Sequence, residues 1–167
     1  ASVLRVADFE EALAVDADLD EARLYLGFQY SLVGRPDRAR VLFRRVQARG
    51  RTPVLQLMAL QSLGLLYDNV GDYRQAATCF AEVVASDEAL GEAGLFPSFV
   101  NLPVSCAKAG LDDQSVEHFA CLAERFPQRL DQIRGLLSRK RYFAATLESN
   151  GVLRDDLRRR VPALFAA

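Results

Sequence analysis

The chain has 167 residues, of which 50% are hydrophobic and 26% charged, and its formal net charge at pH 7 is −1. These values are typical of one globular domain, and the near-balanced charge argues against nucleic acid or an anionic membrane surface as the partner. No apolar run approaches the roughly 20 residues that a membrane-spanning helix needs, so no membrane span is predicted.

One residue pattern occurs three times from residue 26 onward, with identical offsets in each copy. The copies are Leu26-Gly27…Tyr30…Gly34…Ala39…Phe43, Leu63-Gly64…Tyr67…Gly71…Ala76…Phe80 and Leu102-Pro103…Cys106…Gly110…Ser115…Phe119. Self-similarity at a period of roughly 34 to 40 residues is typical of stacked helical repeats, in which each unit is a helix–turn–helix. The sequence therefore predicts a helical-repeat array.

The second copy shows how each unit is expected to fold. Apolar residues at helical spacing predict its first helix, and they are Leu57, Leu60, Leu63 and Tyr67. Gly71 can take the left-handed conformation that ends a helix, and Asp72 can cap the next one. Gly64 and Ala76 are small, as two closely crossing helices require, and Phe80 fills the space beyond the crossing.

The third copy departs from this pattern at Pro103, inside its first predicted helix. A proline there removes a hydrogen bond and costs roughly 3 kcal/mol in an isolated helix. We therefore expect a kink, or a helix that breaks at Leu102. The spacing between copies is uneven, which places short insertions near residues 50–53 and 91–94, with Pro97 at the start of the following helix.

The repeated pattern resembles that of the tetratricopeptide repeat (TPR) family, whose signature is a large apolar residue, Leu-Gly, Tyr, Gly, an aromatic, Ala, Phe, Ala and Pro. This resemblance implies an all-α, right-handed helical-repeat solenoid of about three and a half units, followed by C-terminal capping helices. The expected array covers residues 1–129, with a half unit at 2–19 and units at 20–53, 57–90 and 96–129. Because Phe9 precedes Phe43 by one repeat length, the chain is expected to start in mid-repeat, as a piece of a longer protein.

Residues 130–167 lose the family pattern and are net basic. Apolar stripes predict further helices, with Asn150-Gly151 as a helix stop and Pro162 as the end of the last helix. One interpretation is a cap on the end of the stack. Another is a basic patch that binds acidic protein or, as the weaker alternative, nucleic acid, formed by Arg139, Lys140, Arg141, Arg158, Arg159 and Arg160. A third is a lid that folds back on the acidic body.

The resemblance also implies a concave groove, lined by the first helix of each unit, in which a partner peptide or helix binds. The groove positions are Leu24, Phe28, Ser31, Gln61, Leu65, Asp68, Val100, Asn101, Val104 and Lys108. Phe28, Leu65 and Val104 would form an apolar stripe along it, suited to an amphipathic helix or an extended apolar peptide. Whether the stripe binds a partner or is covered by the C-terminal helices stays open at this stage.

Nothing in the sequence indicates a catalytic or metal-binding site. The chain has one histidine, His118, and lacks Gly-rich phosphate loops and the Gly-x-Ser-x-Gly motif. His118 and Cys121 share a helical face, but a structural zinc site needs four ligands. We therefore predict no catalytic residue, no metal and no cofactor.

The predicted function is that of a non-enzymatic adaptor or scaffold for a partner protein. The alternative is a structural or self-associating segment of a larger repeat protein, with its groove covered by its own C-terminal helices or with a homodimer formed through the truncated N-terminal face. An enzyme whose catalytic domain lies outside this chain is a third class. The odd number of cysteines, without a CxxC pair, and the absence of a visible signal peptide favour a cytoplasmic location.

Overall fold

The computed structural model describes residues 6–16 and 19–165, and these residues form 12 α-helices and two short 3₁₀ helices with no strand. The repeat region contains α1 (Val6–Val15), α2 (Asp20–Leu32), α3 (Pro36–Arg49), α4 (Pro53–Asn69), α5 (Tyr73–Val84), α6 (Glu88–Gly91), η1 (Ala93–Leu95), α7 (Phe96–Lys108) and α8 (Asp112–Arg125). The C-terminal region contains η2 (Pro127–Arg129), α9 (Leu130–Leu137), α10 (Arg141–Ser149), α11 (Gly151–Arg160) and α12 (Pro162–Phe165).

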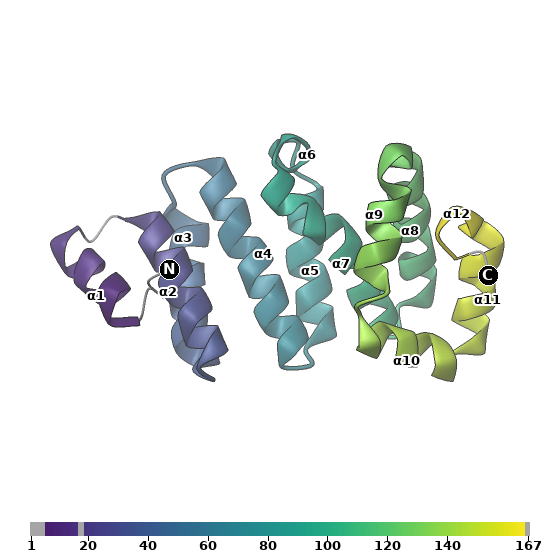
Figure 1. Cartoon of the computed structure of the whole chain (residues 1–167), viewed down its shortest axis with the longest axis horizontal. Helices are drawn as coiled ribbons and strands as arrows, with labels where there is room; N and C mark the ends of the chain where they lie inside the picture. Colours follow the sequence, from purple (N-terminus) through teal and green to yellow (C-terminus); the bar gives the residue numbers. More distant parts are fainter. Residues whose placement is uncertain (1–5, 17–18, 166–167) are drawn as a thin grey trace.

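The helices of the repeat region stack in chain order along the long axis of the molecule (Figure 1). Each packs on the next, α2 on α3, α3 on α4, α4 on α5, α5 on α7 and α7 on α8. The short α6 and η1 occupy the longer connection between α5 and α7, where the uneven spacing predicted an insertion. The expected all-α, right-handed solenoid is confirmed.

A glycine with positive φ ends the first helix of each unit. Gly34, Gly71 and Gly110 have φ values of 73°, 84° and 72°, a region that L side chains rarely adopt. One residue after Gly71, the Asp72 carboxylate accepts a hydrogen bond of 3.3 Å from the backbone N–H of Gln75 and so caps α5. Both roles agree with the sequence prediction.

The first two units close around a contact between a glycine and a phenylalanine ring. A Cβ atom on Gly64 would lie 2.7 Å from the Phe80 ring, and one on Gly27 would lie 2.4 Å from the Phe43 ring. Both rings are fully buried, as is Phe119 in the third unit. The glycines therefore let the two helices of a unit approach until the ring fills the crossing.

The third unit forms without this contact, and its first helix does not break. α7 continues from Phe96 to Lys108 through Pro103, so the expected break at Leu102 is wrong. The helix lies between α5 and α8, and the Ser115 hydroxyl of α8 donates a hydrogen bond of 2.9 Å to the Pro103 carbonyl. Packing on both sides stabilises the helix where the proline removes a backbone bond.

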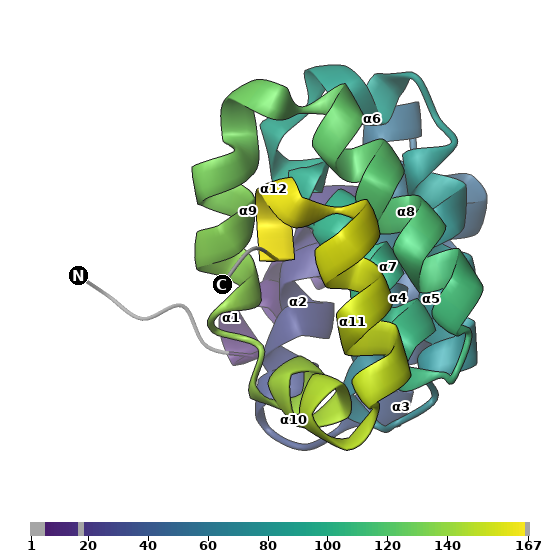
Figure 2. The ribbon, with the colours of Figure 1, turned by 90° about the vertical axis from the view of Figure 1, so that its right-hand side faces the viewer.

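The C-terminal helices close the end of the stack. Figure 2 shows α9, α10, α11 and α12 in front of the repeat helices when the molecule is viewed from that end. α11 packs on α8, α12 on α9 and α11, and α10 on α7. The rings of Phe143 and Phe165 lie 5.6 and 4.9 Å from the Phe119 ring, between centroids, so the cap continues the core of the third unit.

Two details of this region differ from the sequence prediction. Asn150-Gly151 is not only a helix stop, because the Asn150 side chain accepts a 3.1 Å hydrogen bond from the Leu153 N–H and caps α11, whose first residue is Gly151. Pro162 follows α11 but also begins α12. The predicted half unit 2–19 contains α1, while residues 2–5, 17–18 and 166–167 lie outside the described part of the chain.

We predict opposite effects of the same substitution at two helical glycines. Gly64→Ala places a methyl group against the buried Phe80 ring and should lower the free energy of unfolding by about 1–3 kcal/mol. Gly135→Ala, in α9, meets no atom within 4 Å and should raise it by up to about 1 kcal/mol through helix propensity. Thermal unfolding followed by circular dichroism measures both. Equal effects would contradict the assigned Gly64–Phe80 contact.

The three cysteines are free thiols that differ in environment. Burial raises the pKa of Cys79 to about 11, with Glu82 adding to the effect, and burial alone raises the pKa of Cys106 to about 11. Cys106 is thus a small buried core residue, as predicted for its place in the pattern. Cys121 is exposed.

This difference predicts selective alkylation. Below a raised pKa a thiol stays protonated, and the thiolate is the reactive form, so Cys79 and Cys106 should resist iodoacetamide at mildly alkaline pH. Mass spectrometry should find one modified thiol, Cys121, in the folded protein and three in guanidinium. Rapid modification of Cys106 in the folded protein would contradict the packing of α7.

Candidate functional site

The part of the predicted groove that is open lies between α2 and α4, which contact each other. A cleft of about 180 Å³ runs between them. It is lined by Glu21, Leu24, Tyr25, Phe28, Leu55, Met58, Gln61 and Ser62. Most of this lining is apolar, as in sites that bind apolar side chains of a ligand.

Two of the predicted groove residues offer apolar surface to solvent. Phe28 is 40% exposed and Leu65 is 36% exposed. The Phe28 ring meets the buried Phe43 ring edge to face, with centroids 5.5 Å apart, so the core of the first unit holds it in place. Leu24 is buried and contributes to the inner wall of the cleft.

The polar groove residues of the first two units already have partners within the fold. Gln61 accepts a 2.7 Å hydrogen bond from the Ser98 hydroxyl and donates one of 3.0 Å to the Gly94 carbonyl, so it links α4 to η1 and α7. The Ser31 hydroxyl donates to the Gly27 carbonyl of its own helix. The hydrogen-bonding groups of Gln61 and Ser31 are therefore used within the fold, where they hold the helices in place.

The groove residues of the third unit are not accessible. Val100, Asn101 and Val104 are buried. α9 and α10 pack against their helix, and both valines share a core cluster with Ile133 and Phe143 of those two helices. The apolar stripe therefore runs through Phe28 and Leu65, and its C-terminal end is closed by the chain itself.

Lys108, the last predicted groove residue, is held in a polar cluster at this closed end. Its ammonium lies 2.7 and 2.8 Å from the two carboxylate oxygens of Asp68 and 4.3 Å from the centre of the Tyr73 ring. Tyr142 of α10 adds a second ring at 5.9 Å. The ion pair between α4 and α7 thus joins two units at the place where α10 meets the stack.

Lys140 lies close to this cluster. Its pKa is below the ordinary value because burial disfavours the charged form, and nearby Lys108 acts in the same direction while Asp68 opposes it. Of the predicted basic patch, Arg139 is exposed in the turn before α10 and Arg141 at the first residue of α10, while Arg158, Arg159 and Arg160 are exposed in the last turn of α11. Figures 1 and 2 place the start of α10 and the end of α11 at different ends of the cap.

Sequence reasoning missed five residues that line the cleft, Glu21, Tyr25, Leu55, Met58 and Ser62. A signal for some of them was present, because Tyr25 lies three residues before Phe28 and Met58 lies three before Gln61, on the same helical faces. The family pattern directed attention to positions further along each helix.

No described helix is long and apolar enough to cross a membrane. Within residues 6–16 and 19–165, no group of three or more His, Cys, Asp or Glu side chains is placed to hold a metal ion. His118 is half-buried, and burial lowers the pKa of its imidazole against the opposing effect of Glu117.

No protein-family model matches the chain, and no curated protein sequence is significantly similar to it. Solved structures are similar along nearly the whole length. MamA superposes with a TM-score of 0.64 at 16% identity, covering 95% of this chain and 84% of that one. A kinesin light chain of Podosopora anserina with nearly identical TPR-like repeats gives 0.62 at 17% identity, covering 92% and 86% of the two chains. YrrB, described as a TPR protein with an unusual peptide-binding site, gives 0.58 at 16% identity, covering 94% and 76%. The chain therefore has the fold of the tetratricopeptide repeat proteins.

Proposed function

We propose that the chain is a non-enzymatic protein-interaction module that binds an apolar segment of a partner protein in the cleft between α2 and α4. The observation that carries the proposal is the exposed ring of Phe28 in the lining of the cleft, together with Leu65, which is exposed on α4 four residues beyond the cleft residue Gln61. Contiguous exposed apolar patches mark interaction sites, whereas single apolar side chains scattered over a surface do not.

The cleft suits one or two anchoring side chains of a partner helix or extended peptide. Its volume of about 180 Å³ is small, and of its polar residues Gln61 and Ser62 are already hydrogen-bonded within the fold, while Glu21 is exposed at its edge. Affinity would therefore come mainly from removing apolar surface from water, at about 25 cal/mol for each Å². A few buried anchors carry most of the binding energy in such interfaces.

The closed end of the groove limits where a partner can lie. With Val100, Asn101 and Val104 buried, the bound segment would contact the first two units and stop short of α7. The shared fold supports this role, since YrrB is described as having a peptide-binding site. The open cleft also disfavours the alternative in which the whole groove is covered by the chain itself.

The free state of all three cysteines supports a reducing compartment, and we propose the cytoplasm as the setting of this interaction.

Phe28→Glu combined with Leu65→Glu should abolish partner binding, because each charge would be buried without a counter-ion. The probe is a set of peptides selected on the native chain from a randomised display library. Isothermal titration of the selected peptides should show affinity at least about thirtyfold weaker for the variant, corresponding to the roughly 2 kcal/mol lost at an interface hot spot.

The matched control is Leu32→Glu with Val152→Glu, which changes two exposed apolar residues outside the cleft by the same charge. It should retain the affinity of the native chain, and circular dichroism should show both variants folded. Selected peptides that bind all three proteins equally would overturn the cleft assignment.

A second cleft supports self-association as an additional property. It has a volume of about 610 Å³ and is lined largely by apolar residues of α1, α2 and α3, including Leu13, Leu26, Val41 and Leu42. This surface lies at the N-terminal end of the stack, where a homodimer was expected. Glu10, Asp37 and Arg38 add charges of both signs at its edge, so two copies could pair these charges.

Val41→Glu should then lower the mass measured by light scattering from that of a dimer to that of a monomer of 18.5 kDa. Val41 is exposed, so the substitution should leave the fold intact. A native chain that is monomeric at every accessible concentration would contradict the dimer.

A further inference from the structure

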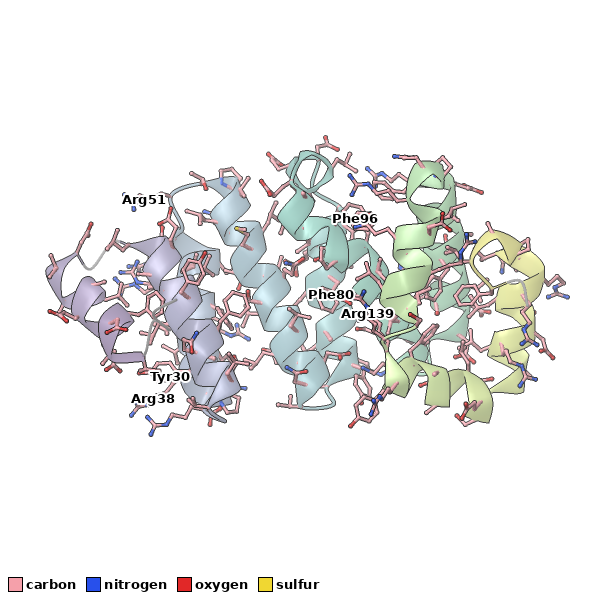
Figure 3. The ribbon with its side chains drawn as sticks, viewed as in Figure 1. Tyr30, Arg38, Arg51, Phe80, Phe96 and Arg139 are labelled. Atoms are coloured by element: carbon pink, nitrogen blue, oxygen red, sulfur yellow. The ribbon has the colours of Figure 1, made fainter. Side chains whose placement is uncertain are left out.

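A pocket lined by arginines lies at the junction of α2, α3 and the turn that follows α3. Its volume is about 370 Å³, and its lining consists of Asp20, Arg23, Arg45, Arg49 and Arg51. Figure 3 shows Arg51 at the edge of the molecule near the α3–α4 turn. Tyr30 and Arg38 lie at the other end of the α2–α3 pair, near the turn that joins these two helices. The protein-binding role proposed above makes no use of this pocket.

The fold brings these residues together because α2 and α3 run antiparallel. Asp20 and Arg23 lie in the first turn of α2, beside Arg45 and Arg49 near the end of α3. The buried carboxylate of Asp20 accepts a 2.8 Å bond from the Arg23 guanidinium and a 2.9 Å bond from the backbone N–H of Arg51. Asp20 thus fixes one guanidinium and the turn that carries another.

The other three arginines of α3 each contact a side chain within the fold. Arg44 donates a 2.9 Å hydrogen bond to the Tyr67 hydroxyl, Arg38 lies over the Tyr30 ring, and Arg40 pairs with Asp37. Within the described part of the chain, Arg45 and Arg49 make no hydrogen bond or ion pair. They are one helical turn apart, where like charges repel. Arg49 lies in the last turn of α3, where the helix dipole stabilises a positive charge. Arg45 lies one turn earlier, so the dipole does not explain an arginine at that position.

Among the residues that the structure describes, the pocket lining contains one carboxylate, that of Asp20, and four arginines. The Asp20 carboxylate bonds the Arg23 guanidinium, and the exposed Glu21 lies 3.9 Å from the Arg51 guanidinium, so neither of these contacts involves Arg45 or Arg49. An anion between Arg45 and Arg49 would relieve their repulsion and accept charge-assisted hydrogen bonds from both.

We propose that this pocket binds a phosphoryl group. The planar guanidinium fork matches the oxygens of a phosphate, and several forks around one hollow can satisfy an oxyanion that carries two charges. The volume leaves room for the group to which the phosphate is esterified. The free phosphate ion and a phosphate monoester share this chemistry, so the experiment treats them as separate arms.

The probes are inorganic phosphate and phenyl phosphate, titrated into the ¹⁵N-labelled chain while NMR follows the arginine side-chain Nε–H signals. Sodium chloride keeps the ionic strength constant, so that screening does not change. Inorganic phosphate should produce saturable shifts with a dissociation constant on the order of 1 mM. Binding of both probes assigns the site to phosphate esters, and binding of inorganic phosphate alone assigns it to the free ion; either result supports the proposal.

Arg45→Gln with Arg49→Gln should weaken phosphate binding at least about tenfold, since it removes the two guanidinium groups without internal partners. Both arginines are exposed, so the variant should unfold at the temperature of the native chain. The control, Arg139→Gln with Arg158→Gln, removes the same charge from the cap and should bind as the native chain does. Shifts that grow linearly without saturation, or equal affinity in the two double variants, would overturn the proposal.

Discussion

The structure depends on one steric constraint, the contact between a glycine of one helix and a phenylalanine ring of the next. At Gly27 and Gly64 there is no room for a Cβ atom against the rings of Phe43 and Phe80. The glycines therefore set how closely the two helices of a unit pack. The first helices of the first two units, α2 and α4, contact each other, and the cleft lies between them.

The third unit shows what happens when this constraint is replaced. Pro103 and Ser115 stand where the earlier units have Gly and Ala, and the serine hydroxyl bonds the proline carbonyl across the crossing. Phe119 stays fully buried, but it now packs with Phe143 and Phe165 from the cap. The unit is thus joined to the C-terminal helices, which also bury the groove positions of α7. The same segment ends the solenoid and shortens the groove.

The two candidate sites, the cleft between α2 and α4 and the arginine pocket, differ in physical character. The cleft between α2 and α4 is lined mostly by apolar side chains, and its Gln61 and Ser62 side chains are hydrogen-bonded within the fold, so it favours burial of apolar groups. The pocket is lined by four arginines, of which Arg45 and Arg49 make no hydrogen bond or ion pair within the described part of the chain, and this supports the proposed anion. Glu21 lines the cleft and lies beside Arg51 of the pocket, which makes the two sites neighbours. One partner with an apolar segment and a phosphoryl group could reach both.

Local rules were enough to predict the repeat pattern, the helix-ending glycines, the Asp72 cap and the small residues at the helix crossings, because each depends on residues close in sequence or on fixed offsets. Local rules did not predict the effect of Pro103, because α7 stays continuous through it where α5 and α8 pack on that helix. The accessibility of the predicted groove was likewise decided by tertiary structure. Val104 has the same place in its unit as Leu65, yet one is buried and the other exposed, because α9 and α10 fold back over α7. Spacing along a chain determines which face of a helix a residue occupies, whereas what covers that face depends on segments far away in the sequence.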